Sequence, residues 1–450
     1  MILLINPKTT KSREVQTQYF REPNLGLLYL AAILDQFNFH VDILDLEQYA
    51  LLENFDLNSL IKAKIQPYNI FGLTSLTNNF ALTEEIIQMI KLLKPDSKII
   101  LGGPHVSFQY ADILRENALV DYICIGEAEH SFPLLINLLY KRLNNEISDA
   151  NFESQISQIK GIAYKIEENN VIFTGYCDPT NVDDLPLPAR YKLEQEHYLY
   201  RVANVIINRG CPNQCSFCSR QNLFRKPRIR SIESILSEID DIISLQNYDY
   251  INFYDNININ SRFFKEFCEM FINNKINIPW GCELRIDSIT LDEAKLLKNA
   301  GCKLVATGIE SANVDVLKKN FKFQDPEQVL EGIINLKSED IPIQAYFVLG
   351  LPGETEETVL QTIKYIKRLP FDSNDQINFF AATPYPGSRL WEEMNDFMLK
   401  IIEKDFSKYD CEHVIFETDT LKKSELDRLF QLVKTVENQI NGDIKNQLMW

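Results

Sequence analysis

Basic residues are scarce in this 450-residue sequence: 46 Lys and Arg stand against 63 Asp and Glu, for a formal net charge of −17. Nucleic-acid binding depends on a basic surface that neutralises phosphates, so this balance argues against a nucleic-acid partner. No apolar run is long enough to cross a bilayer, and the apolar start of the chain is shorter than the core of a signal peptide. The composition, with 45% hydrophobic residues, predicts a globular chain without a membrane span.

Paired cysteines are also missing. The nine cysteines are odd in number and do not form the spacing of a disulfide framework, so we expect a reducing, cytoplasmic location. Six of them are isolated in the sequence: Cys124, Cys177, Cys268, Cys282, Cys302 and Cys411. Neither G-x-G-x-x-G after the first strand nor G-x-x-x-x-G-K-[ST] occurs, which weakens dinucleotide and P-loop hypotheses.

The remaining three cysteines form the most informative stretch of the sequence. Cys211, Cys215 and Cys218 lie at C-x3-C-x2-C spacing, directly after an apolar run that ends at Asn208. Three thiolates on one short loop suit an iron–sulfur cluster or zinc. A closed zinc site requires a fourth ligand, and no second Cys or His pair occurs at finger or ribbon spacing. A cubane cluster held by three thiolates leaves one iron open for a substrate, so we favour a catalytic cluster and keep structural zinc as the alternative.

Residues 1–142 alternate short apolar runs with amphipathic segments, which predicts a doubly wound, Rossmann-like α/β domain. The expected strands are Ile2–Asn6, Val41–Leu46, Ile70–Ser75, Lys98–Gly102 and Tyr122–Gly126. The carboxyl ends of three of them carry polar or glycine residues: Thr74, Ser75, Gly102, Gly103, Gly126 and Glu127. Ligands of open α/β sheets bind at these carboxyl ends, so the six residues are candidate cofactor contacts; plain turns between strand and helix are the alternative.

Residues 143–200 read as a linker that contains a β-hairpin from two apolar segments around 161–166 and 171–174. Strand–helix alternation resumes over residues 201–395, and residues 396–450 form a small helical C-terminal extension. Six strands are expected in the second alternating region: Ala203–Asn208, Tyr250–Tyr254, Pro279–Glu283, Leu304–Gly308, Ile343–Leu349 and Gln376–Ala381. Their carboxyl ends carry polar or glycine residues, as the active face of a TIM-like barrel requires.

The cysteine loop closely resembles the signature of the radical S-adenosylmethionine superfamily. The resemblance implies a partial (β/α)6 TIM-like barrel over 201–395 and a [4Fe-4S] cluster bound by Cys211, Cys215 and Cys218. In that family the open iron binds S-adenosylmethionine, and an electron from the cluster cleaves it to a 5′-deoxyadenosyl radical. An electron donor such as flavodoxin or ferredoxin is therefore an expected partner.

The same resemblance implies S-adenosylmethionine contacts just past the strand ends. It places Phe217 near the adenine, Asp255 near the methionine amino group, Glu283 at the ribose hydroxyls, Arg285 at the carboxylate and Glu310 in a Gly-Ile-Glu-Ser motif. Ordinary packing is the alternative for Phe217. A salt bridge on the barrel rim is the alternative for Glu283, Arg285 and Glu310.

The amino-terminal region resembles the cobalamin-binding domain of the cobalamin-dependent class of these enzymes. Three stretches carry the resemblance: Pro23–Leu34, Leu101–His105 and Ile125–Glu129. No histidine lies in the D-x-H-x-x-G context that supplies a lower axial ligand in other cobalamin proteins; the five are His40, His105, His130, His197 and His413. We therefore expect cobalamin without histidine ligation, and a domain that binds nothing is the alternative.

These resemblances imply a radical enzyme that methylates an unactivated carbon or phosphorus centre of a small molecule, lipid or peptide. Two alternatives stay open. One is a cobalamin-dependent rearrangement or cyclisation without methyl transfer. The other is a nucleic-acid-modifying methylthiotransferase, which needs three further cysteines in its amino-terminal domain, whereas only Cys124 and Cys177 precede the loop.

Overall fold

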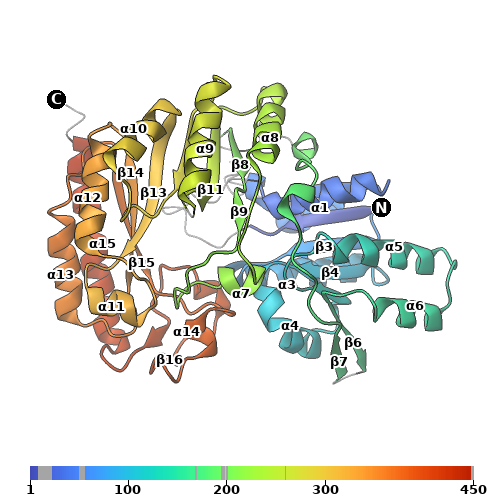
Figure 1. Cartoon of the computed structure of the whole chain (residues 1–450). Helices are drawn as coiled ribbons and strands as arrows, with labels where there is room; N and C mark the ends of the chain where they lie inside the picture. The colour runs from blue at the N-terminus through green and yellow to red at the C-terminus, as the bar shows by residue number, and fades with distance from the viewer. Residues whose placement is uncertain are drawn as a thin grey trace. The chain divides into compact units, whose positions relative to one another are not determined.

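The computed structural model describes residues 1–8, 23–49, 56–167, 170–193, 198, 201–258 and 260–446; His197 lies outside these ranges. The chain divides into two compact units. The first comprises residues 1–201 with 222–226, and the second comprises residues 202–221 with 227–450. Each unit is built on its own sheet (Figure 1).

The first unit contains a seven-stranded sheet in the order β2-β1-β3-β4-β5-β6-β7. Its strands are β1 (Ile2–Asn6), β2 (Val41–Asp45), β3 (Ile70–Thr74), β4 (Lys98–Gly102), β5 (Tyr122–Cys124), β6 (Ile162–Glu167) and β7 (Asn170–Phe173). Its helices are α1 (Leu25–Gln36), α2 (Leu57–Lys64), α3 (Phe80–Leu93), α4 (Pro104–Glu116), α5 (Ser131–Leu143) and α6 (Asp149–Ile156).

The first five strands are parallel, which confirms the predicted doubly wound arrangement. Ile2 and Leu4 pack with α1 and α5 in one apolar cluster. Leu3 and Ile5, whose side chains point to the other face, are equally buried, because helices cover both faces of such a sheet. β5 ends at Cys124, earlier than predicted, since Gly126 adopts a φ of +73° that leaves the extended conformation.

The predicted hairpin forms, but its place depends on pairing between distant residues. β6 and β7 are antiparallel to each other, and β6 pairs antiparallel with β5 through Tyr122 and Tyr164. The hairpin therefore extends the sheet of the first unit. The boundaries of the linker that contains it stay a prediction.

The second unit contains six parallel strands in the order β15-β14-β13-β12-β11-β8, which confirms the predicted partial (β/α)6 barrel. These strands are β8 (Val202–Val205), β11 (Tyr250–Asn256), β12 (Trp280–Glu283), β13 (Cys302–Glu310), β14 (Ile343–Leu349) and β15 (Gln376–Ala381). Two short antiparallel pairs accompany them: β9 (Asn208–Arg209) with β10 (Arg228–Ile229), and β16 (Lys400–Ile401) with β17 (Phe416–Glu417).

The helices from residue 220 onward are α7 (Arg220–Phe224), α8 (Ile232–Leu245), α9 (Ser261–Asn273), α10 (Leu291–Asn299), α11 (Val314–Lys319), α12 (Pro326–Lys337), α13 (Glu356–Ile366), α14 (Arg389–Glu392) and α15 (Lys423–Asn446). The long helix α15 follows the open edge of the sheet. Glu437 accepts a hydrogen bond from the Phe379 backbone N–H at 2.6 Å, and Asn441 bonds both backbone groups of Ile377. The extension thus satisfies edge-strand groups that would otherwise lack partners.

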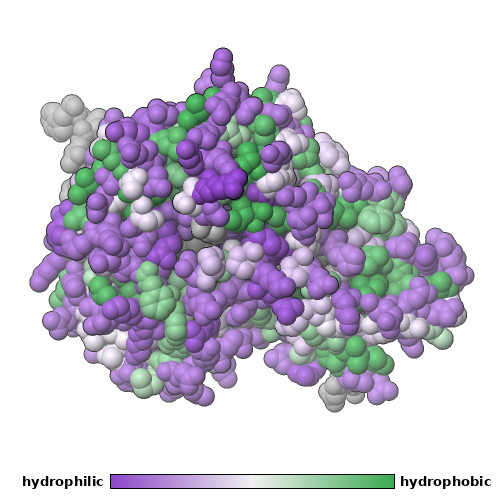
Figure 2. All heavy atoms as spheres, in the orientation of Figure 1, coloured by the Kyte–Doolittle hydropathy of each residue, from purple (hydrophilic) through white to green (hydrophobic). Residues whose placement is uncertain are grey.

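Hydrophilic residues predominate on the face shown in Figure 2, with apolar residues scattered among them. Across the ranges that the structure describes, no helix combines the length and apolar composition needed to cross a bilayer.

Candidate functional site

The three cysteines lie on the loop between β9 and α7, at the carboxyl end of the first barrel strand. None forms a disulfide, and each is partly exposed. Burial raises the pKa of Cys215 to about 11, against the opposing effect of nearby Lys322, and burial also raises the pKa of Cys218. In the described part of the chain no group of three or more His, Cys, Asp or Glu side chains is arranged around a single metal ion. The cluster hypothesis rests instead on the loop and its anchors.

Asp255, at the end of β11, holds both stems of this loop. Its Oδ2 accepts hydrogen bonds from the backbone N–H groups of Ile207 at 2.9 Å and Asn208 at 3.1 Å, before the first cysteine. Its Oδ1 forms an ion pair with Arg220, two residues after the last cysteine. Arg220 also donates to the Asn208 carbonyl at 3.2 Å. One buried carboxylate therefore joins the two ends of the loop.

The middle of the loop has a separate anchor. Ser216, between the second and third cysteines, is fully buried and donates to Asn320 Oδ1 at 2.7 Å. Its backbone N–H donates to the Asn320 carbonyl at 3.0 Å, and its own carbonyl accepts from Leu390. Asn320 is also fully buried. The protein thus fixes the loop backbone through its own hydrogen bonds, as a preformed cluster site requires.

We predict that Asp255→Asn will lower both iron incorporation and stability. The change leaves Arg220 without its anion, at a cost of about 2–4 kcal/mol, somewhat below that of a fully buried pair because Arg220 keeps partial exposure. Anaerobic reconstitution with iron quantification and chemical unfolding would measure both effects.

Asp375→Asn is the matched control. Asp375 is a buried carboxylate that likewise accepts a backbone N–H, from Ile343 at 2.7 Å, and pairs with a cation, Lys337, at 2.7 Å. It lies before β15, outside the cysteine loop, so its variant should lose comparable stability and still take up iron. Equal iron loss in the two variants would contradict a specific role for Asp255.

The predicted S-adenosylmethionine contacts differ in how far their side chains are already engaged. Asp255 already bonds the cysteine loop through both of its carboxylate oxygens. Arg285 pairs with Asp287 at 2.7 Å and donates to the Phe323 carbonyl at 2.6 Å and to Asn213 Oδ1 at 3.3 Å. The arginine therefore makes the rim salt bridge that was its alternative assignment, and it also contacts the cysteine loop.

Glu310 is held by Lys322, a residue that sequence analysis missed. The two side chains are largely buried, and Lys322 Nζ lies 3.0 Å from Glu310 Oε1. Glu310 also has a φ of +64°, a conformation that costs energy for any residue other than glycine and is concentrated at functional sites. No motif marks Lys322, which follows α11 and reaches Glu310 only through the fold.

Glu283 differs from these residues because the structure shows no hydrogen bond to its carboxylate from the described residues. It ends β12, and burial raises its pKa to about 7, with Arg220 and Lys322 opposing the shift. Phe217, by contrast, packs against the apolar cluster that includes Val316 and Leu351. The adenine contact expected for Phe217 stays a prediction.

In the first unit, the structure brings the predicted contact residues of β3 and β4 together. The Ser75 backbone N–H donates to the Gly102 carbonyl at 2.9 Å, and the His105 N–H donates to the Ser75 carbonyl at 3.3 Å. The third strand end is linked through Ser107, whose Oγ donates to the Gly103 carbonyl at 2.8 Å and accepts the Gly126 N–H at 2.9 Å.

The two glycines of this turn face different surroundings. A Cβ at Gly103, whose φ is +101°, would lie 2.7 Å from the Ser75 carbonyl oxygen, so this glycine is required by close backbone packing. A Cβ at Gly102 would have no atom within 4 Å. Open space thus lies against the Gly102 backbone, as a flat cofactor that approaches the strand end requires.

His105 turns into the protein. Its ring packs against Phe80 at a tilt of 44°, with centroids 4.6 Å apart, and its Nδ1 lies 3.2 Å from Thr77 Oγ1. Burial lowers its pKa to about 4. The side chain is 1% exposed. This histidine is part of the core beneath the turn that follows β4.

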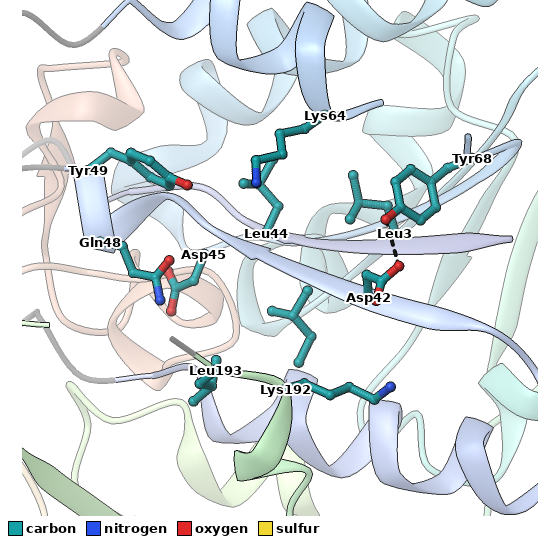
Figure 3. A pocket seen from close by; sticks show the side chains of 11 residues that line it. Leu3, Asp42, Leu44, Asp45, Gln48, Tyr49, Lys64, Tyr68, Lys192 and Leu193 are labelled. Atoms are coloured by element: carbon teal, nitrogen blue, oxygen red, sulfur yellow. Dashed lines mark hydrogen bonds between the residues drawn. The ribbon is translucent and has the colours of Figure 1, made fainter. Parts of the chain in front are cut away.

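A different pocket, of about 320 Å³, lies along edge strand β2 (Figure 3). Lys64 and Lys192 approach it from opposite sides of the strand, and Tyr68 donates to Asp42 at 2.6 Å. Asp45, at its end, is buried and bonded by Asn6 at 2.8 Å and Tyr198 at 2.7 Å. None of the six predicted cofactor contacts lines this pocket.

Comparisons with known proteins agree with the two units. Residues 205–366 match the model of the radical SAM superfamily, and residues 15–136 match that of the B12 binding domain. The chain is 30% identical to an uncharacterized methyltransferase of Pyrococcus horikoshii, over 87% of this chain and 82% of that protein. It is also 30% identical to the bacteriochlorophyllide d C-12(1)-methyltransferase of Chlorobaculum tepidum, over 93% of this chain and 83% of that protein.

A third relative has another activity. The anaerobic magnesium-protoporphyrin IX monomethyl ester cyclase of Rubrivivax gelatinosus is 31% identical over 80% of this chain, which spans only 63% of the cyclase. Among solved structures, the methyltransferase TsrM of Kitasatospora setae, with cobalamin and a [4Fe-4S] cluster bound, superimposes with a TM-score of 0.69. That match covers 90% of this chain and 81% of TsrM at 16% identity, which establishes a shared fold.

Proposed function

Because this chain belongs to the radical S-adenosylmethionine superfamily and also carries a B12 binding domain, we propose that it is a cobalamin-dependent methyltransferase. Its acceptor would be an unactivated carbon or phosphorus centre of a small molecule, lipid or peptide. The observation that carries the proposal is that one chain combines two candidate cofactor sites: a cysteine loop held by protein hydrogen bonds, and a strand end with open space at Gly102.

The residues of the chain would bind and orient the cofactors. Cys211, Cys215 and Cys218 would bind the [4Fe-4S] cluster, Glu283 would accept hydrogen bonds from S-adenosylmethionine, and the Gly102 crevice would receive cobalamin. When bound, the cluster supplies the electron that cleaves S-adenosylmethionine, and the corrinoid supplies the methyl group. An electron donor such as flavodoxin or ferredoxin is part of the proposal, as is a reducing cytoplasmic compartment.

A second candidate function is a cobalamin-dependent cyclisation or rearrangement without methyl transfer. The 31% identity to the Rubrivivax cyclase favours it. A methylthiotransferase has less support. Of the two cysteines that precede the loop, Cys124 is buried in the sheet core, where its thiol pKa is raised by burial.

The test is anaerobic reconstitution of the full chain with iron, sulfide and cobalamin, followed by absorption spectroscopy and product analysis with S-adenosylmethionine and a reductant. Methyl transfer predicts bound cluster and corrinoid, with both S-adenosylhomocysteine and 5′-deoxyadenosine among the products. Formation of 5′-deoxyadenosine alone in the presence of the acceptor would support the second candidate.

We predict that Glu283→Gln will weaken S-adenosylmethionine binding and leave the cluster intact. Above about pH 8, a carboxyl with a pKa of about 7 is mostly ionised, and its charge-assisted hydrogen bond to a ligand hydroxyl is worth enough to raise the dissociation constant roughly tenfold when the charge is removed. Equilibrium binding to the reconstituted protein would measure the change. Glu266→Gln, on the exposed face of α9 where Glu266 pairs with Arg262, is the control, and an equal constant in both variants would rule out the contact.

A further inference from the structure

The barrel sheet of the second unit has two chemically different faces. Alternate residues such as Ile251, Phe253 and Ile377 pack with the surrounding helices in a single apolar core. The intervening residues point to the inner face. We call the level of Tyr250, the first residue of β11, the floor of this face. The Tyr250 hydroxyl lies against Gly281, and a Cβ added to Gly281 would come within 3 Å of that hydroxyl, so the glycine makes room for the tyrosine.

Five carboxamides occupy the inner face above this floor: Asn204, Asn252, Gln344, Gln376 and Asn378. Asn204 pairs in register with Asn252, and Gln344 pairs with Gln376. The hydrogen bonds that link these side chains to one another are long, at 3.3–3.5 Å. Among the described residues, the buried Nδ2 of Asn378 has no hydrogen-bond partner, although its Oδ1 accepts from Gln376. This belt of carboxamides therefore keeps at least one hydrogen-bond donor, the Nδ2 of Asn378, that no described residue uses.

Charge is absent from the same region. Between the floor and the last residue of each described strand, no inner-face side chain is charged. The cations nearest the strand ends are already paired: Arg220 with Asp255, Arg285 with Asp287, and Lys322 with Glu310. Tyr346 and Phe380, with ring centroids 5.8 Å apart, add an aromatic surface on neighbouring strands.

We propose that the inner face of the barrel binds an uncharged substrate moiety with both hydrogen-bond donors and acceptors, such as a carboxamide, with an aromatic or apolar part against Tyr346 and Phe380. This inference rests on the proposed function and names its substrate class. Amide side chains offer a donor and an acceptor each, and they complement a neutral polar group. Below the strand ends a carboxylate, phosphate or ammonium group would have no counter-ion and would lose its hydration uncompensated. The Glu283 carboxylate lies beyond this part of the face, at the end of β12, where we assign it to S-adenosylmethionine.

Three probes of similar shape separate these classes: benzamide, benzoate and benzylammonium. Ligand-observed NMR titration of the reconstituted full chain, without S-adenosylmethionine, should give benzamide about fivefold tighter binding than either ion. Tighter or equal binding of benzoate or benzylammonium would overturn the proposal.

Two variants locate the binding. Gln376→Glu has the same shape and adds an anion, so it should weaken benzamide binding and reverse the preference toward benzylammonium. Asn378→Leu should lose benzamide binding, and Gln361→Leu, an exposed amide on α13, should behave as the native protein. An unchanged probe ranking in Gln376→Glu, with native iron content and melting temperature, would show that the probes bind elsewhere and would overturn the site.

The outcome is separable from that of the proposed function. If 5′-deoxyadenosine and S-adenosylhomocysteine form while benzamide shows no preference, the substrate class is wrong and the methyltransferase proposal stands. If the probes rank as expected and S-adenosylmethionine is not cleaved, the neutral site stands and the methyltransferase proposal fails.

Discussion

Replacement of Cys211, Cys215 or Cys218 by Ala should abolish S-adenosylmethionine cleavage. Two thiolates cannot hold a cluster that needs three protein ligands and one open iron, so a single substitution removes the site rather than weakening it. Anaerobic reconstitution should show a loss of the iron–sulfur absorption band, and 5′-deoxyadenosine should fall to background. The loop should keep its backbone position in these variants, because Asp255 and Asn320 hold it independently of the thiols.

Cys302→Ala is the control for this experiment. Cys302 is 2% exposed and lies in the apolar core of the barrel beside Cys282. Its loss leaves a small cavity, which costs about 1 kcal/mol and touches no proposed ligand. Native iron content is expected. Equal iron loss from Cys302→Ala and the loop variants would contradict the ligand assignment.

Corrinoid binding should be lost in Gly102→Phe, while iron content stays native. A Cβ at Gly102 meets no protein atom, so a side chain can start there without a clash, and we expect the phenyl ring to enter the space that we assign to the corrin. Reconstitution with cobalamin, desalting and absorption spectroscopy would measure retention. Retention of cobalamin by Gly102→Phe at the native level would show that the site lies elsewhere.

Gly103 gives a contrasting variant at the next residue. Any side chain there meets the Ser75 backbone and must adopt a positive φ, at a cost of about 1–3 kcal/mol. Gly103→Leu would therefore disturb the crevice itself, and its loss of cobalamin would not distinguish steric exclusion from local unfolding. His105→Ala should lower stability through the lost contact with Phe80, and it should leave the axial spectrum of bound cobalamin unchanged.

Most of the strands could be predicted because their signals are local. Ile2–Asn6 and Lys98–Gly102 form as expected, and the apolar runs near 203, 251 and 345 become parallel barrel strands. Strand ends were less predictable. β5 stops before Gly126 because a backbone conformation, rather than hydrophobicity, ends it. The hairpin was visible in the sequence, whereas its addition to β5 depends on pairing across about 40 residues.

The sequence by itself determined the cysteine loop, the two α/β patterns and the strand-end glycines, because each is a spacing or a periodicity within a few residues. Only the tertiary structure decided which charged side chains are already paired with one another. Asp255 reaches the loop stem across 48 residues and Asn320 reaches Ser216 across 104. The inner belt of amides also depends on the register of the strands. Such contacts arise where strands from distant parts of the chain meet at one edge of a sheet, and no local pattern records which side chains will meet there.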